Sequence, residues 1–152
     1  MSTLTASLGL TRINGSRWLM ILLTVAGLGV SAYLMWGYTI PGATLACGDS
    51  SGCETVKNSA YASLLGIPLP VMGLVTYATL LLLLLASNRF MTWTAYIALA
   101  IFGISLMGVL YSAYLTYLEL FVIEAICRWC VASAIIMVVI FGLSTLNLYR
   151  EG

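Results

Sequence analysis

Four long apolar stretches constrain the fold of this chain more than any other feature of its sequence. They cover residues 18–38, 67–86, 91–118 and 126–148. Each is about 20 residues or longer, which is the length that an α-helix needs to cross the hydrocarbon core of a bilayer. Only 7% of all residues are charged, against about 25% in a typical soluble domain. We therefore expect an all-α integral membrane protein, a four-transmembrane-helix bundle that forms one domain over residues 17–150.

Arginines mark one side of this expected bundle. Arg12 and Arg17 precede the first stretch, Arg89 lies between the second and third, and Arg150 follows the fourth. Because positive charges favour the cytoplasmic side, both termini are expected in the cytoplasm, with residues 1–16 as a polar, poorly ordered tail. The opposite side, which carries every cysteine, would then face the periplasm, a lumen or the exterior, where thiols pair or do redox work.

The connection over residues 39–66 is the only long segment outside the expected spans. Its first half is rich in glycine, serine and aspartate, so we expect it to be irregular. Its second half, ETVKNSAYASLL, has the composition of a short helix, which Gly66 and Pro68 would end. The predicted architecture is therefore a membrane bundle with one extramembrane loop and a short helix between the first two spans.

Small residues recur inside the spans, as in the pair Gly27 and Ser31. Spacings of four let helix backbones approach closely in lipid. We therefore assign most of these residues, including Gly103 and Gly108, to helix packing. Gly73, near the outer end of the second span, could instead leave room for a flat ligand.

The four cysteines form two pairs, Cys47 with Cys53 in the loop and Cys127 with Cys130 at the start of the fourth stretch. Residues three apart on a helix have Cβ atoms roughly 5–6 Å apart, which is close to disulfide geometry. A helix N-terminus also lowers a thiol pKa. Reversible redox chemistry is therefore favoured for CRWC over an inert disulfide or half of a zinc site. A structural disulfide in the loop would close a very short ring and stabilise little.

Two thiol pairs on one side of a membrane suggest an electron relay. The chain has no histidine, no haem ligand pattern and no nucleotide-binding loop, so the terminal acceptor has to come to the protein. A lipid-soluble quinone fits, because CRWC lies at the membrane boundary beside apolar helix ends. Water or a thiol would then supply the quinol protons, while Lys57 and Glu124 are expected to be solvated charges. Trp129 would either anchor at the interface or pack near the quinone.

Three motifs together resemble the vitamin K epoxide reductase family, in its bacterial branch. They are C-x5-C-x5-S in the loop, LLGIPLPVMG before the second span, and CxxC opening the last helix. The resemblance covers roughly residues 22–148 and implies a four-helix bundle around a quinone. It implies a thiol:quinone oxidoreductase that takes electrons from a separate thioredoxin-like, DsbA-type partner and gives them to ubiquinone or menaquinone. The partner could then form disulfides in secreted proteins.

The resemblance also assigns roles to single residues. Cys47 resembles the outer loop cysteine that exchanges with the partner, and Cys53 the one that then attacks CxxC. Cys127 resembles the cysteine that receives this attack, and Cys130 the one whose thiolate reduces the quinone. Ser59 resembles the family's Ser/Thr beside the active cysteines.

Two positions depart from the vertebrate members of that family. Ala134 stands where they carry a tyrosine, and Leu69 stands at about the position of their asparagine. Both departures favour quinone reduction over reduction of vitamin K epoxide, which remains an alternative. The quinone is expected to contact Cys130, Ser59, Gly73 and Ala134.

Two other classes of protein stay open on the sequence alone. A membrane scaffold with two structural disulfides would need no electron acceptor. A transport or metal-binding protein could use four thiolates, but transport paths usually carry ionisable residues inside the membrane, and the interiors of the expected spans contain none. We expect no metal site, and a net charge of +1 gives no argument for a nucleic-acid partner.

Overall fold

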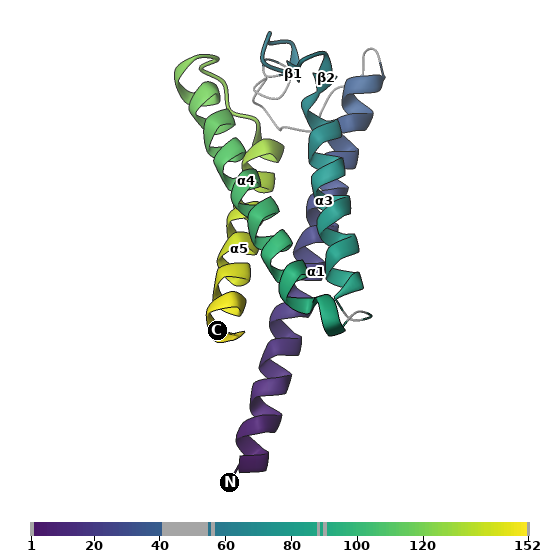
Figure 1. The fold of residues 1–152 in the computed structure, drawn as a ribbon. Coiled ribbons are helices and arrows are strands. Elements are labelled where there is room, and N and C mark those ends of the chain that lie inside the picture. The colour runs from purple at the N-terminus through teal and green to yellow at the C-terminus, as the bar shows by residue number, and fades with distance from the viewer. Residues whose placement is uncertain (1, 41–54, 56, 88, 90, 152) are drawn as a thin grey trace.

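Four long helices form the protein, as a computed structural model shows (Figure 1). The structure describes residues 2–40, 55, 57–87, 89 and 91–151. The long helices are α1 (Ser2–Thr39), α3 (Leu69–Ala86), α4 (Thr94–Phe121) and α5 (Arg128–Glu151). Two short strands, β1 (Ser63–Leu64) and β2 (Ile67–Pro68), precede α3, and a 3-10 turn, η1 (Met91–Trp93), precedes α4.

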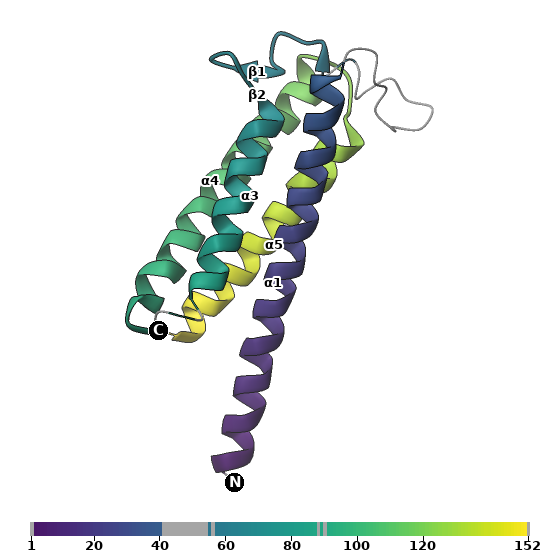
Figure 2. The same cartoon turned by 90° about the vertical axis from the view of Figure 1, so that its right-hand side faces the viewer.

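All four helices are long and apolar enough to cross a membrane, over residues 15–39, 69–86, 94–121 and 128–150. The expected four-helix membrane bundle is thereby confirmed, with each span within a few residues of its expected place. The N-terminal segment differs, because α1 begins at Ser2 and residues 2–16 are helical rather than an irregular tail. That segment contains no proline, and a helix that is already nucleated propagates through polar residues at little cost. Figure 2 shows α1 extending well past the lower ends of the other helices.

The helices pack as two pairs, α1 with α3 and α4 with α5, and α1 also runs along α5. Their shared core lies toward the end of the bundle that holds the C-terminus, where Tyr77, Leu80 and Ile140 are at most 1% exposed. Met20, Leu84, Ile101 and Met137 complete this cluster. The contact between α3 and α4 is looser, and these two helices diverge toward the strand end of the bundle (Figure 1).

Some of the small residues in the spans lie where two helices touch, and others do not. A Cβ atom on Gly27 would overlap the Tyr77 ring, and one on Gly108 would lie 2.8 Å from the Met137 sulfur. Both glycines therefore serve helix packing, as expected. A Cβ on Gly103 would meet nothing within 4 Å, so the assignment of this glycine to packing was wrong.

Between the first two spans, where a short helix is expected, a short helical stretch is followed by turns and then by a β-hairpin. Helical geometry is found only at Thr55 and Lys57 among the described residues of that segment, and turns begin at Asn58. The hairpin turn has positive φ at both central residues, 54° at Leu65 and 84° at Gly66. Such two-residue turns match the twist of paired strands. The helical stretch therefore ends before Asn58, earlier than the expected end at Gly66.

The hairpin leads directly into α3. Ser63 pairs with Pro68 and Leu64 with Ile67, and the backbone N–H of Leu69 donates to the carbonyl of Ala62 at 3.1 Å. Pro70 lies in the first turn of α3, where a missing N–H does no harm. The hairpin is thereby held over the strand end of the bundle.

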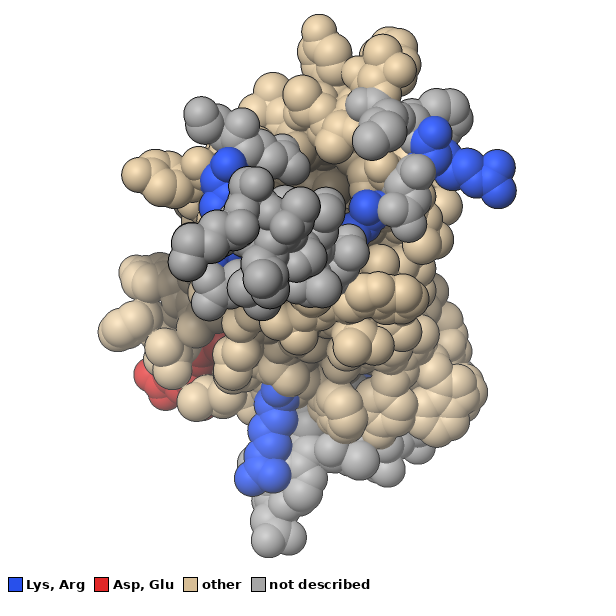
Figure 3. All heavy atoms as spheres, turned by 90° about the horizontal axis from the view of Figure 1, so that it is seen from below, with Lys and Arg blue, Asp and Glu red and all other residues tan. Residues whose placement is uncertain are grey.

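Basic side chains lie at the opposite end, where both termini are found. Figure 3 views the molecule from that end and shows several basic side chains around it. Arg17 donates to the carbonyl of Leu84 at 2.7 Å and to the Ser87 hydroxyl at 2.6 Å. A cation at a helix C-terminus is stabilised by the helix dipole, so Arg17 fastens α1 to the end of α3.

Candidate functional site

The CRWC motif forms the N-terminus of α5. Cys127 immediately precedes the helix, and its carbonyl accepts a hydrogen bond from the backbone N–H of Val131 at 3.0 Å. Cys130 follows in the first turn, and no disulfide joins the two cysteines in this structure. Cys127 is 2% exposed and packs against Leu34 of α1, whereas Cys130 is half-buried. The motif therefore buries the Cys127 thiol and leaves the Cys130 thiol partly accessible.

The surroundings of Cys127 favour its thiolate. A hydrogen bond from the Cys130 thiol lowers the pKa of Cys127, and this effect outweighs burial, which raises it. The backbone N–H groups of Cys130 and Trp129 lower the pKa further, while the nearby charge of Glu119 opposes them. The direction agrees with that expected for a thiol at a helix N-terminus.

Glu119 is the functional candidate that the sequence interpretation missed. Helix α4 continues to Phe121, three residues beyond the expected end of its span, and so carries Glu119 into the bundle, where it is 4% exposed. The backbone N–H of Cys127 donates to its Oε2 atom at 3.3 Å, and the Cys130 thiol lies within hydrogen-bonding reach of the same carboxyl. The available signal was one acidic residue inside the apolar run YLTYLELFVI, because ionisable residues within spans mark functional sites.

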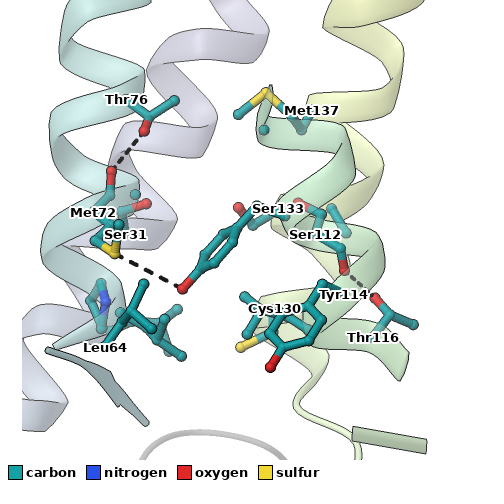
Figure 4. Close-up of a pocket in the computed structure, with 18 of the residues that line it drawn as sticks. Ser31, Leu64, Met72, Thr76, Ser112, Tyr114, Thr116, Cys130, Ser133 and Met137 are labelled. Atoms are coloured by element: carbon teal, nitrogen blue, oxygen red, sulfur yellow. Dashed lines mark hydrogen bonds between the residues drawn. The ribbon is translucent and has the colours of Figure 1, made fainter. Parts of the chain in front are cut away.

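A cavity of about 720 Å³ opens beside CRWC, bounded by α1, α3, α4, α5 and the hairpin. Figure 4 shows side chains from helices on both sides converging on it, with Cys130 at its wall. The wall is mainly apolar, and its polar groups are few. Among them are Ser31, Thr76, Tyr111, Ser112 and Glu119. A large apolar pocket with a few convergent polar groups is the usual form of a small-molecule site.

The cavity brings together most of the residues that the sequence singled out. Cys127, Cys130, Gly73 and Ala134 all line it. Ser59 is not among the lining residues; it lies in the turn before the hairpin, where its carbonyl accepts a hydrogen bond from the N–H of Ala62 at 3.1 Å. Cys47 and Cys53 lie outside the described residues, so the structure gives no geometry for the loop pair.

Gly73 has a packing role in addition to its place on the cavity wall. A Cβ atom there would lie 2.8 Å from the Ser31 hydroxyl. The glycine therefore allows α1 and α3 to approach closely at the edge of the cavity. Leu69, at the start of α3, lines the same cavity, so neither it nor Ala134 offers a polar side chain there.

Two of the tyrosines that line the cavity make contacts between helices. Tyr77 crosses from α3 to α5, where its hydroxyl lies 3.0 Å from the carbonyl and 2.9 Å from the hydroxyl of Ser133. Tyr111 belongs to α4, and its hydroxyl lies 3.9 Å from the Met72 sulfur, a weak acceptor. Figure 4 labels Met72 and marks this contact with the dashed line that starts at its sulfur. The Tyr111 hydroxyl can therefore donate to a polar atom in the cavity. A tyrosine inside an apolar span carries no distinct sequence signal, because the same residue also packs cores.

Trp129 points away from the cavity and against α1. Its ring centroid lies 4.8 Å from that of Tyr33, and it is not among the lining residues. Trp129 therefore packs between α5 and α1 and not on the cavity wall, and its role as an interfacial anchor stays a prediction. Glu124 is exposed, as expected for a solvated charge.

A comparison with known protein families agrees with this geometry. The sequence model of the vitamin K epoxide reductase family matches residues 18–145. The match covers most of the chain, including the greater part of all four spans and CRWC. The chain therefore belongs to the vitamin K epoxide reductase family, a family of multi-pass membrane oxidoreductases that act on thiols and quinones.

Proposed function

We propose that this protein is a thiol:quinone oxidoreductase that reoxidises a thioredoxin-like, DsbA-type partner and passes the electrons to a membrane quinone. The observation that carries the proposal is the position of Cys127 and Cys130 on the wall of an apolar cavity of about 720 Å³. Pockets for small molecules have volumes of about 300–1,000 Å³. Two thiols beside such a pocket can give two electrons to a molecule bound in it.

The lining of the cavity fits a quinone. Apolar side chains from four helices suit the ring and its hydrocarbon tail, and the Tyr111 hydroxyl can donate to a carbonyl oxygen. Cys130 is the cysteine that would meet the ring. When bound, the quinone supplies a two-electron acceptor. Leu69 and Ala134 add no polar group to the cavity, which favours quinone over epoxide as the substrate.

The loop pair would connect this site to the partner. Cys47 and Cys53 belong to the segment between α1 and the hairpin. The C-terminal end of α1 and the hairpin both lie at the end of the bundle that carries CRWC (Figure 1). This supports a relay in which Cys47 exchanges with the partner and Cys53 attacks Cys127. Basic residues at the opposite end support cytoplasmic termini, so that the partner would be met in the periplasm, a lumen or the exterior.

The relay is tested by steady-state quinone reduction with two electron donors, a reduced thioredoxin-like protein and a small dithiol. Cys130→Ala should be inactive with both donors, since electrons reach the quinone through Cys130. Cys47→Ala should lose activity mainly with the protein donor, because a small dithiol can reach CRWC directly. Full activity of Cys130→Ala would refute the proposal and favour a scaffold with structural disulfides.

A further inference from the structure

Glu119 is a buried carboxyl whose described partners include no cation. It is 4% exposed, and it contacts the Cys127 backbone N–H and the Cys130 thiol. Among the described residues, no lysine or arginine lines the cavity that it borders. A buried carboxylate without a cationic partner costs several kcal/mol, and uptake of a proton relieves that cost. A function in the chemistry of the two cysteines would explain why a carboxyl is buried beside them at this cost.

The contacts of Glu119 suit proton transfer better than structural support. The backbone N–H of Cys127 fixes the Oε2 atom at 3.3 Å, which holds the carboxyl at the end of α4 against the start of α5. The Cys130 thiol, which has to lose its proton before its sulfur can react, lies within hydrogen-bonding reach. A general base has to lie that close to the proton that it removes.

We propose that Glu119 is a catalytic residue that accepts the proton of the Cys130 thiol and delivers it to a quinone oxygen. This inference rests on the proposed function and identifies the proton path of the same site. The chain has no histidine, so Glu119 takes the role that imidazole often has. The remaining titratable groups among the described residues of the cavity are the two thiols and the hydroxyls of Tyr38, Tyr61, Tyr77, Tyr111 and Tyr114.

The reaction balances with one proton from Glu119. As the Cys127–Cys130 disulfide forms, the two sulfurs lose two electrons and the quinone gains them. The S–H bond of Cys130 breaks, and its proton moves to the Glu119 carboxylate and then to one quinone oxygen. Cys127 reacts as its thiolate, so the second oxygen takes its proton from water. The carboxylate is regenerated for the next turnover.

The test is a single-turnover measurement on the full chain, reduced beforehand and mixed with a short-chain ubiquinone. Glu119→Gln keeps a carbonyl oxygen for the Cys127 N–H but cannot accept a proton. Loss of a general acid or base typically lowers a rate about 10²–10⁴-fold. We therefore expect the single-turnover rate constant to fall at least about 100-fold, with an unchanged half-saturating concentration of quinone. Glu124→Gln, an exposed carboxyl outside the cavity, is the matched control and should react at the wild-type rate.

A wild-type rate in Glu119→Gln overturns the inference while leaving the proposed function intact. A wild-type protein that does not reduce quinone overturns both. Should Glu119→Gln not be recovered folded, time-resolved infrared spectra of wild type and Glu119→Asp during one turnover decide. A protonated-carboxyl absorption that appears and then decays during turnover, and that shifts in Glu119→Asp, supports proton transfer, and the absence of such an absorption overturns it.

Discussion

The contact between Gly27 and Tyr77 gives a sharp test of how the bundle is held together. Gly27 is buried on α1, and the Tyr77 ring, 1% exposed, covers it. A Cβ atom on Gly27 would overlap that ring. The ring cannot move freely, because its hydroxyl is bound to the carbonyl and hydroxyl of Ser133 on α5. Gly27→Ala therefore perturbs the packing of three helices at once.

The expected loss of stability follows from these contacts. Overpacking a tight core typically costs about 1–3 kcal/mol, and breaking the Tyr77–Ser133 hydrogen bonds adds about 1 kcal/mol. We expect Gly27→Ala to reduce the free energy of unfolding by about 2–4 kcal/mol. Tyr77→Phe, which removes only the hydroxyl, should account for about 1 kcal/mol of this.

Gly29→Ala on the same helix is the matched control. A Cβ atom there would meet nothing within 4 Å, and alanine is a better helix former than glycine by up to about 1 kcal/mol. Unfolding curves in mixed detergent micelles would compare the variants at one protein concentration. If Gly27→Ala unfolds at the same denaturant level as Gly29→Ala, the packing argument is refuted.

Three further predictions concern the ends and the cavity of the bundle. Arg17→Ala should lower the free energy of unfolding by about 1.5–3 kcal/mol, the range for hydrogen bonds to charged groups. Arg89→Ala, which changes an exposed side chain, should unfold like wild type, and an equal loss of stability in both variants would contradict the prediction. Because the pKa of Cys127 is lowered, its thiolate should persist at pH values below the ordinary thiol pKa of about 8.5. Ultraviolet absorbance of the thiolate, measured in a variant without the loop cysteines, checks this. Cys130→Ala removes the main cause, so the titration should move to higher pH, and no movement would refute the assigned hydrogen bond. Tyr111→Phe should raise the quinone KM about fivefold, equivalent to one hydrogen bond of about 1 kcal/mol, and an unchanged KM would exclude Tyr111 as the donor.

The spans and the CRWC site could be predicted because each depends on local sequence. Hydrophobic length alone identifies a helix that crosses a membrane, and CxxC at the start of a helix fixes the spacing of its own thiols. For the same reason the lowered pKa of Cys127 could be expected from its place at a helix N-terminus. Gly27 could be assigned to packing from its spacing to Ser31, although its partner on α3 could not be named.

The remaining features depend on contacts between segments that are distant in the sequence. The sequence places Glu119 just beyond a span, at the membrane surface, whereas the extra turn of α4 that buries it is stabilised by packing against the start of α5. The hairpin could not be predicted because its turn has Leu65 at positive φ, a conformation that glycine or asparagine would have signalled. The cavity, with Tyr111 and Ala134 on different helices, exists only once the bundle is assembled.

Electron transfer from CRWC to a quinone is the central claim, and a stoichiometric titration tests it most directly. Reduced protein carrying Cys47→Ala and Cys53→Ala, which leaves only Cys127 and Cys130, would be mixed anaerobically with quinone. Quinol formation and loss of thiols would then be counted in the same sample. The account predicts two thiols lost for each quinol formed, and no quinol when Cys130→Ala is added. Quinol formation without thiol loss, or no quinol at all from the two remaining thiols, would contradict it.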